Sequence, residues 1–202
     1  MSKLKTKRQL QAIETKQKLV KAAKEVFFEQ GFQKSTIQQI IKQAETGYGT
    51  AYVYFKNKDD FLVEIMQETM EQFYKVATMP FTPSSKAEAE QLIGNQVKLF
   101  LTLALENKDL MKLLKEAIGV SPEVEEHWLT IRNRFIENIT KDIQYAQDKA
   151  LANAELLPSI VARSWFYTNE MFMWELVSGN TQNIDDIVSH MTILYTRGLY
   201  NF

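Results

Sequence analysis

The sequence predicts an all-α fold, and three features of its residues lead to this prediction. Glycine and proline number only seven and four among 202 residues, so few positions interrupt a helix. Apolar residues recur three and four positions apart over long stretches, which is the period of an amphipathic helix. No stretch alternates apolar and polar residues between turn signals, so we expect no sheet. We expect about nine helices, in a small N-terminal domain, residues 1–62, and a larger C-terminal helical domain, residues 63–202.

The first three predicted helices lie within the first sixty residues. Gly31 ends the first helix, because glycine readily takes the conformation that closes a helix. Ser35 or Thr36 caps the second helix, and the third spans roughly residues 47–54 after a short break. Two apolar stripes support the first and second helices: Leu19, Ala22, Ala23, Val26 and Phe27 in one, and Ile37, Ile40, Ile41 and Ala44 in the other. Three short helices with a tight turn between the second and third predict a helix-turn-helix.

The remaining helices are bounded by capping residues and prolines. Asn57 caps the fourth helix, which runs to about Ala77 and is followed by a linker over residues 79–85. Ser84 or Ser85 restarts a helix that runs to about Glu106. The later helices are expected over about 109–117, 122–152, 158–179 and 184 to the C-terminus, with Pro122 and Pro158 at first-turn positions.

The charge of the chain is unevenly distributed. Residues 1–60 carry twelve Lys and Arg against six Asp and Glu, whereas residues 61–202 carry twelve against nineteen. The N-terminal end is therefore suited to approach a polyanion. Cysteine is absent, which excludes disulfides, thiolate metal sites and cysteine nucleophiles. Neither a secretory signal nor a membrane span is expected, since no window approaches about 18 uncharged apolar residues.

The N-terminal segment contains an ordered set of residues: Ala23, Phe27, Gly31, Phe32, Ser35, Thr36, Ile37, Ile40, Ala44 and the run Gly-Thr-Ala-Tyr-Val-Tyr-Phe-Lys-Asn-Lys-Asp from Gly49 to Asp59. In these residues the segment resembles the tetracycline-repressor (TetR) family over about 50 residues, roughly Lys16 to Leu62. The resemblance implies a dimeric regulator, most readily a repressor, which binds palindromic operator DNA and is released by a small hydrophobic effector. It also implies no cofactor and a cytoplasmic, nucleoid-associated protein.

Two residues depart from the family pattern in the turn. Glu45 stands where the family usually has glycine, and a positive φ there would cost about 1 kcal/mol. Gly47 replaces the usual capping side chain of the third helix.

The expected DNA contacts come from the helix-turn-helix and a basic arm. Thr36 caps the second helix and can face a phosphate, while Tyr48 and Thr50 of the third helix are expected to meet base edges. By resemblance, Tyr52 and Tyr54 contact phosphate, although a role in the helix–helix core is the alternative. The full expected set is Lys5, Lys7, Arg8, Thr36, Gln38, Gln39, Gly47, Tyr48, Gly49, Thr50, Tyr52, Tyr54 and Lys58. The arm, which includes Lys3, would enter the minor groove, with a solvated tail as an equal alternative.

The C-terminal domain is expected to hold an apolar effector pocket and a dimer interface. The expected pocket residues are Phe100, Leu103, Leu114, Trp128, Ile131, Arg132, Phe135, Trp165, Asn169 and Met173, with Arg132, Asn169 and Glu170 as polar candidates. By resemblance, the last two helices form a four-helix bundle across a two-fold axis. The expected interface residues are Phe172, Leu176, Ile187, Met191, Leu194, Tyr195 and Gly198.

Three other functions are alternatives. The C-terminal domain would bind a protein co-regulator in the first, and the chain would act as an activator in the second. The third, an all-α enzyme, is remote, because the sequence holds no phosphate loop, nucleophile motif or metal-ligand spacing, and His127 and His190 are far apart. We expect no catalytic and no metal-binding residues.

Overall fold

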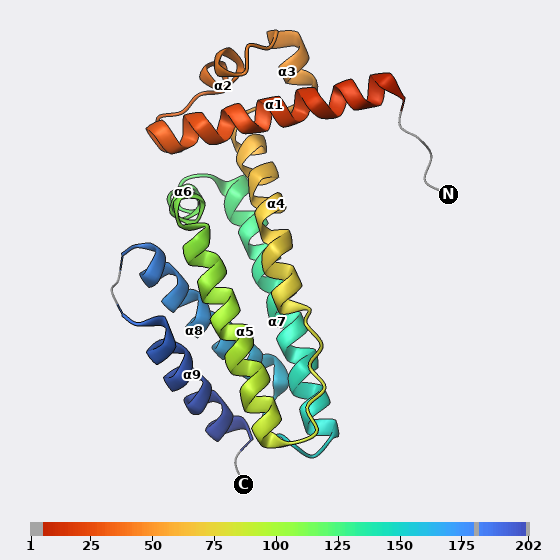
Figure 1. Ribbon diagram of the computed structural model, residues 1–202, viewed down its shortest axis with the longest axis vertical. Coiled ribbons are helices and arrows are strands. Elements are labelled where there is room, and N and C mark those ends of the chain that lie inside the picture. The colour runs from red at the N-terminus through yellow and green to blue at the C-terminus, as the bar shows by residue number, and fades with distance from the viewer. Residues whose placement is uncertain (1–5, 180–181, 201–202) are drawn as a thin grey trace. The chain divides into compact units, whose positions relative to one another are not determined.

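The computed structural model describes residues 6–179 and 182–200, and this part of the chain consists of helices with no strand (Figure 1). The all-α prediction is therefore confirmed. The helices are α1 (Lys7–Gln30), α2 (Ile37–Gln43), α3 (Tyr48–Tyr54), α4 (Lys58–Ala77), α5 (Lys86–Glu106), α6 (Lys108–Ile118), α7 (Pro122–Asp148), α8 (Pro158–Val177) and α9 (Ile184–Leu199). Within the described residues, no helix is both long and apolar enough to cross a membrane.

The chain forms two compact units. The first unit contains the chain up to Glu68 together with Leu113–His127, and the second contains Thr69–Lys112 and the chain from Trp128 onward. Helices α4, α6 and α7 therefore contribute residues to both units. We expected the boundary between the two domains near residue 62, and we did not expect residues 113–127 to group with the N-terminal helices.

The first unit is built on the apolar stripes of α1 and α2. Leu19, Ala23 and Phe27 are almost fully buried, and α1 packs directly against α2. The ring of Phe55 stacks on Phe61 with centroids 3.9 Å apart, which fixes the end of α3 against the start of α4. These contacts hold the short helices in place, because helices of seven residues are not stable alone.

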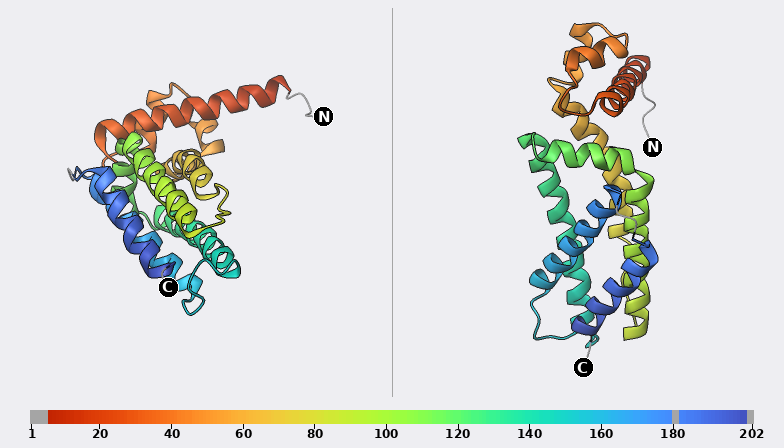
Figure 2. Two further views of the ribbon diagram at one scale, coloured as in Figure 1. Left: turned by 60° about the horizontal axis from the view of Figure 1, so that its bottom comes forward. Right: turned by 90° about the vertical axis from the view of Figure 1, so that its left-hand side faces the viewer.

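The second unit is organised around α5, which packs against α8 and α9. Figure 1 and the left view of Figure 2 both show α9 running alongside α5. Aromatic rings fill the interior: Phe100 makes edge contacts with Phe73 at 5.5 Å and with Phe135 at 6.0 Å. Phe135 in turn lies 5.7 Å from Phe166. Apolar rings from α4, α5, α7 and α8 therefore meet in one core.

Two helix ends differ from the sequence prediction. Helix α1 begins at Lys7, where Thr6 and Gln9 form a capping box, so Lys7 and Arg8 lie in the first helical turn and not in an extended arm. Lys3 and Lys5 lie outside the described residues. Helix α7 ends at Asp148, before the expected end near Ala152, because Ala150 adopts a φ of 54° that closes the helix.

Candidate DNA-binding surface and effector pocket

The turn between α2 and α3 contains a residue in the left-handed backbone conformation. Glu45 adopts a φ of 46°, the left-handed conformation that glycine would take with less strain. Gly47 caps α3 with extended backbone and no side-chain hydrogen bond. The turn therefore keeps its geometry at the expense of local strain.

Helix α3 has one buried face and one exposed face. Ala51 and Phe55 are buried, as predicted, and they fix the helix to the first unit. Tyr48 and Tyr52 are 56% and 44% exposed, and Thr50 is also exposed. Exposed aromatic side chains on so short a helix are available to a partner, whereas a core role would have buried them. Sequence reasoning missed Val53, which at 77% exposure is the most accessible apolar side chain of α3.

The start of α2 is held by a second capping box. The Thr36 hydroxyl accepts a hydrogen bond from the backbone N–H of Gln39, and the Gln39 side chain accepts one from the backbone N–H of Thr36 at 2.8 Å. The Gln39 amide also donates to the Gln30 side chain at 2.9 Å. Gln38 is exposed and makes no such contact within the described residues. Of the two glutamines, Gln38 is the one that is free to reach a ligand.

Lys58 has partners that the sequence did not predict. Its amine donates to the backbone carbonyls of Phe32 at 2.7 Å and Gln33 at 3.2 Å, and it lies 4.4 Å from the centre of the Phe32 ring. We expected Lys58 to contact a DNA phosphate; in this structure its ammonium group binds the carbonyls of the α1–α2 turn. Since these carbonyls follow the end of α1, a cation close to them is favourable.

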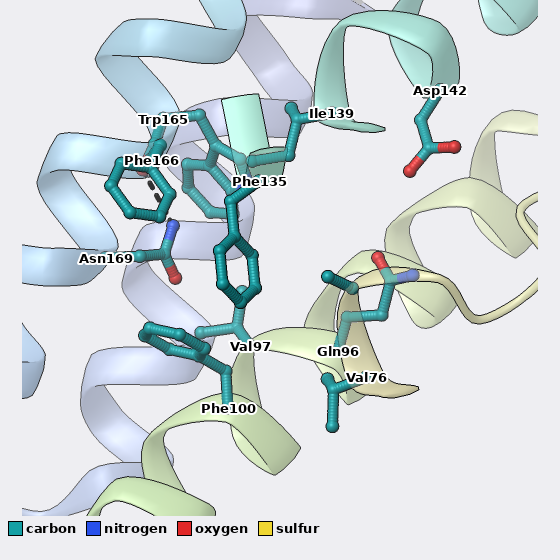
Figure 3. Close-up of a pocket in the computed structure, with 11 residues that line it drawn as sticks. Val76, Gln96, Val97, Phe100, Phe135, Ile139, Asp142, Trp165, Phe166 and Asn169 are labelled. Atoms are coloured by element: carbon teal, nitrogen blue, oxygen red, sulfur yellow. Dashed lines mark hydrogen bonds between the residues drawn. The ribbon is translucent and has the colours of Figure 1, made fainter. Parts of the chain in front are cut away.

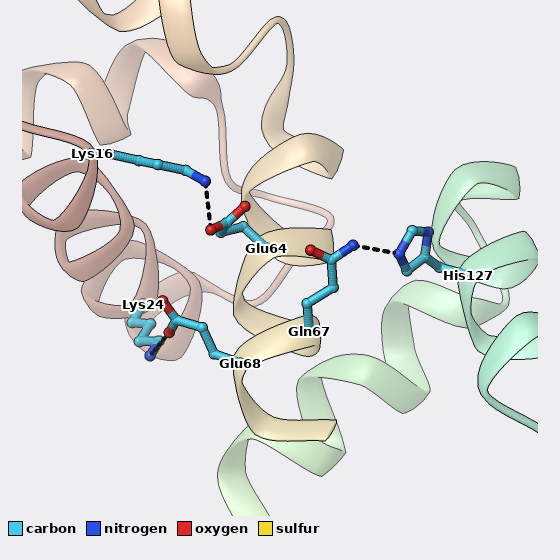
Figure 4. Close-up of polar contacts among 6 residues, drawn as sticks. All are labelled: Lys16, Lys24, Glu64, Gln67, Glu68 and His127. Atoms are coloured by element: carbon cyan, nitrogen blue, oxygen red, sulfur yellow. Dashed lines mark hydrogen bonds and ion pairs between the residues drawn. The ribbon is translucent and has the colours of Figure 1, made fainter. Parts of the chain in front are cut away.

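Ion pairs join α1 to the first half of α4 (Figure 4). Lys16 contacts Glu64 at 2.6 Å, and two turns further along α1, Lys24 contacts Glu68 at 3.1 Å. On another side of α4, the Gln67 amide lies 2.8 Å from a ring nitrogen of His127 in α7. Exposed pairs add little stability individually, but together they fix the orientation of α4 on α1.

The end of α6 and the start of α7 are fastened to the same unit. The Glu116 carboxylate accepts hydrogen bonds from the backbone N–H groups of Phe32 at 3.3 Å and Gln33 at 3.0 Å. The Ser121 hydroxyl donates to the Asp59 carboxylate. Burial, and secondly the charge of nearby Asp60, raise the pKa of Glu123. Residues 113–127 are therefore joined to the helix-turn-helix by hydrogen bonds and belong to the same compact unit.

The second unit contains a pocket among α4, α5, α7 and α8, shown in Figure 3. Its walls are Val76, Ala77, Gln96, Val97, Phe100, Phe135, Ile139, Asp142, Trp165, Phe166 and Asn169. The cavity volume is about 70 Å³, and the empty space is about 490 Å³ when the open mouth is included. Since ligand sites commonly hold 300–1,000 Å³, a drug-sized molecule would have to widen this cavity.

The pocket unites some of the predicted residues and leaves out others. Phe100, Phe135, Trp165 and Asn169 line it, as expected. Trp128 and Arg132 lie elsewhere, because both donate hydrogen bonds to the buried carboxylate of Glu170, at 2.7 and 2.8 Å. Of the other predicted residues outside the pocket, Leu103 lines a neighbouring groove that shares Val76 with the pocket. Leu114 is buried in the first unit, and Ile131 and Met173 are buried core residues of the second.

Sequence reasoning missed the polar end of the pocket, formed by Gln96 and Asp142. Helical spacing could have placed Asp142 on the same face of α7 as Phe135, since Phe135, Ile139 and Asp142 stand at i, i+4 and i+7, but not opposite Gln96 of α5. Burial raises the pKa of Asp142 to about 7, and the charge of Lys141 offsets this only in part. No three His, Asp or Glu side chains of the described residues are grouped as a metal site would need.

Several residues predicted for the dimer interface are buried inside the protomer. Leu176, Ile187 and Met191 are 4–6% exposed, so they are core residues of the second unit. Tyr195 stacks on Trp165 with centroids 4.0 Å apart. Of the predicted set, Leu194 is 76% exposed, Gly198 is exposed and Phe172 is half-buried.

A different apolar stripe is exposed on α8. Ile160, Tyr167 and Met171 stand at i, i+7 and i+11 and are 60%, 42% and 47% exposed. This spacing places them on one face of the helix, on which large apolar side chains meet solvent.

Comparison with known proteins gives a consistent result. Residues 19–65 match the model of a family described as bacterial regulatory proteins, tetR family. The fatty acid metabolism regulator protein of Bacillus subtilis (strain 168) is 31% identical over 119 residues, which are 59% of this chain and 57% of that relative. The match therefore spans less than two thirds of that relative. The transcriptional repressor DhaR of Mycobacterium sp. (strain GP1) is 23% identical over 147 residues, 73% of this chain and 74% of DhaR.

Solved structures share the fold over nearly the whole chain. Salmonella enterica GusR superimposes with a TM-score of 0.76 at 17% identity and covers 100% of both chains. A complex of SmeT with triclosan gives a TM-score of 0.71 at 17% identity, with 93% of this chain and 92% of SmeT covered. At these identities the likeness shows the architecture, a helix-turn-helix followed by a larger helical domain.

Proposed function

We propose that the chain, whose residues 19–65 match the tetR family of bacterial regulatory proteins, is a dimeric transcriptional repressor released by a small hydrophobic effector. The observation that carries the proposal is the two-faced helix α3. Its buried face, Ala51 and Phe55, anchors it, while Tyr48, Thr50 and Tyr52 face outward. A recognition helix needs this division between anchor and reading surface. Such a protein would act in the cytoplasm on nucleoid DNA and would not be an enzyme.

The proposed DNA contacts are of two kinds. Tyr48 and Thr50, on the first turn of α3, would meet base edges in the major groove, where Gly49 allows close approach. Thr36, Gln38, Tyr52 and Tyr54 would contact the backbone. The positive net charge of residues 1–60 would add a sequence-independent attraction to the duplex.

Dimerisation would give this surface its specificity. The exposed stripe of Ile160, Tyr167 and Met171, together with Leu194, is the surface that we propose for the partner subunit. Covering it would remove large apolar side chains from water, which is the main driving force of association. Two recognition helices would then read half-sites about 34–36 Å apart.

Release by an effector would act through helix α4. Val76 and Ala77, near its end, line the pocket, while Glu64 and Glu68, nearer its start, pair with α1. A ligand that widens the pocket would displace α4, and the ion pairs would transmit the movement to α1. By linkage, effector and operator would then weaken each other's binding by the same factor.

A gel-shift assay tests the proposal, with the purified chain, DNA from upstream of its own gene and hydrophobic compounds as candidate effectors. We expect retarded DNA that a compound releases. Binding that only a protein partner relieves would favour the co-regulator alternative, and a promoter–reporter fusion would separate repression from activation. Enzymatic turnover of a substrate by a chain that binds no DNA would favour the enzyme alternative and contradict the proposal.

A further inference from the structure

The pocket has an apolar end and a polar end. Aromatic rings of Phe100, Phe135 and Phe166 lie on one side, whereas the carboxyl of Asp142 and the amide of Gln96 face each other on the other side (Figure 3). Among the described residues that line the pocket, Asp142 is the one with an ionisable side chain, and none is Lys, Arg or His. The polar end is therefore acidic.

The Asp142 carboxyl has no partner within the described residues. No hydrogen bond or ion pair reaches its oxygens, and the Gln96 amide is equally without one. The charged or polar groups near Asp142 are Lys141, which precedes it on α7, and Tyr195 and Tyr200 at the end of the chain. A partly buried carboxyl without a donor is unfavourable, so a molecule that supplies a donor gains from meeting it.

Three kinds of hydrophobic ligand can be compared at this end. A carboxylate would lie against Asp142 with no cation on the walls to neutralise it, so it would be repelled. A neutral hydroxyl would donate one hydrogen bond to the carboxyl. A protonated amine would donate one as well and would add the attraction between opposite charges.

We propose that the effector is a hydrophobic amine, with its apolar body among the aromatic rings and its ammonium group between Asp142 and Gln96. This rests on the proposed function, because it concerns the effector of the same pocket. The apolar body supplies most of the binding energy, and Asp142 selects the head group. The amide oxygen of Gln96 accepts a second hydrogen bond from the ammonium group.

Isothermal titration calorimetry of the full chain, without DNA, tests this proposal with octylamine, octanol and octanoate at pH 8. We expect octylamine to bind at least tenfold more tightly than octanoate, with octanol between them. In Asp142→Asn the preference for the amine over octanoate should fall at least fivefold, while octanol affinity stays within twofold. Asp148→Asn, on an exposed part of the same helix, is the matched control and should keep the preference.

Two results would overturn the proposal. Octanoate binding as tightly as octylamine, or an unchanged preference in Asp142→Asn, would show that Asp142 does not select the head group while leaving the pocket as the effector site. Failure of all three probes to bind would overturn the amine proposal and also remove this cavity from the proposed function. Circular dichroism of each variant checks that a lost preference is not a lost fold.

Discussion

The carboxylate of Glu116, near the end of α6, accepts a hydrogen bond of 3.0 Å from the backbone N–H of Gln33 in the turn between α1 and α2. The preceding N–H, that of Phe32, reaches the same carboxylate at 3.3 Å. Both donors belong to the turn that leads into the helix-turn-helix. Helix α6 is therefore tied to the turn between α1 and α2 by one of its own side chains.

Removing this carboxylate should loosen the turn. We expect Glu116→Ala to lower the free energy of unfolding by about 1 kcal/mol, since two partly solvated hydrogen bonds to a charged group are lost. Urea unfolding measures this loss. In the DNA-release assay, the variant should also need at least threefold more effector for half-release. Glu125→Ala removes an exposed carboxylate of α7 and should change neither quantity. If Glu116→Ala left both the unfolding free energy and the effector requirement unchanged, the contact would be dispensable.

The tyrosine hydroxyls of α3 should contribute directly to DNA affinity. We expect Tyr52→Phe to weaken binding to upstream DNA about three- to tenfold, because it removes one hydrogen bond of about 1 kcal/mol and leaves the ring in place. Fluorescence anisotropy with labelled DNA measures the change. Tyr145→Phe alters a tyrosine of α7 that belongs neither to the pocket nor to the proposed dimer surface, and it serves as the control. Equal affinities for both variants would place Tyr52 outside the interface.

Relieving the backbone strain at Glu45 should raise the free energy of unfolding. Glu45→Gly replaces a side chain at a φ of 46° by the residue that prefers this conformation, so the protein should gain about 0.5–1 kcal/mol. Loss of the exposed 4.0 Å pair with Lys18 should subtract little. Chemical denaturation checks the gain. A loss of stability would show that other contacts of Glu45 outweigh the strain.

A charge on the exposed face of α8 should prevent dimerisation. In Ile160→Glu or Met171→Glu the carboxylate would have to be buried without a partner, which should shift the protein to monomers at micromolar concentration. Analytical ultracentrifugation reports the mass. Leu129→Glu introduces the same charge at an exposed leucine of α7 and should leave the dimer intact. Dimers that persist in both α8 variants would place the interface elsewhere.

Asp142 should make stability depend on pH. Because its folded pKa of about 7 lies above its ordinary value of 3.8, the folded state binds the proton more tightly. The resulting stabilisation is fully present below about pH 4 and is lost as the pH rises to about 7. After allowance for solvent exposure, Asp142→Asn should raise the unfolding free energy at pH 8 by about 1–2 kcal/mol. Thermal unfolding between pH 5 and 8 measures the slope, which should flatten in the variant; a slope equal to that of the unsubstituted protein would contradict this.

The helices could be predicted well from sequence, because their signals are local. Thr36 and Ser85 cap helices that begin at the next residue, and Gly31 and Gly179 take positive φ where helices end. The end of α7 could not be predicted in the same way, since Ala150 adopts a conformation that alanine usually avoids.

The functional residues divide along the same line. The exposure of Tyr48 and Tyr52 follows from the buried positions of Ala51 and Phe55 on one short helix. The role of Lys58 depends instead on the position of the Phe32 carbonyl, which is distant in sequence. The polar end of the pocket depends on the packing that brings Gln96 of α5 close to Asp142 of α7. Contacts between distant segments form these sites. Helical periodicity identifies the apolar face of each helix, but it does not show which other helix packs against that face.

Fluorescence anisotropy of the purified chain with upstream DNA, measured from 50 to 300 mM salt, tests the central claim most directly. If α3 enters the major groove and basic residues neutralise phosphates, affinity should fall steeply and linearly with salt on logarithmic axes. The complex should contain two chains, and an excess of unrelated duplex should not displace the upstream fragment. A monomeric protein without salt-sensitive affinity for that fragment would contradict the account.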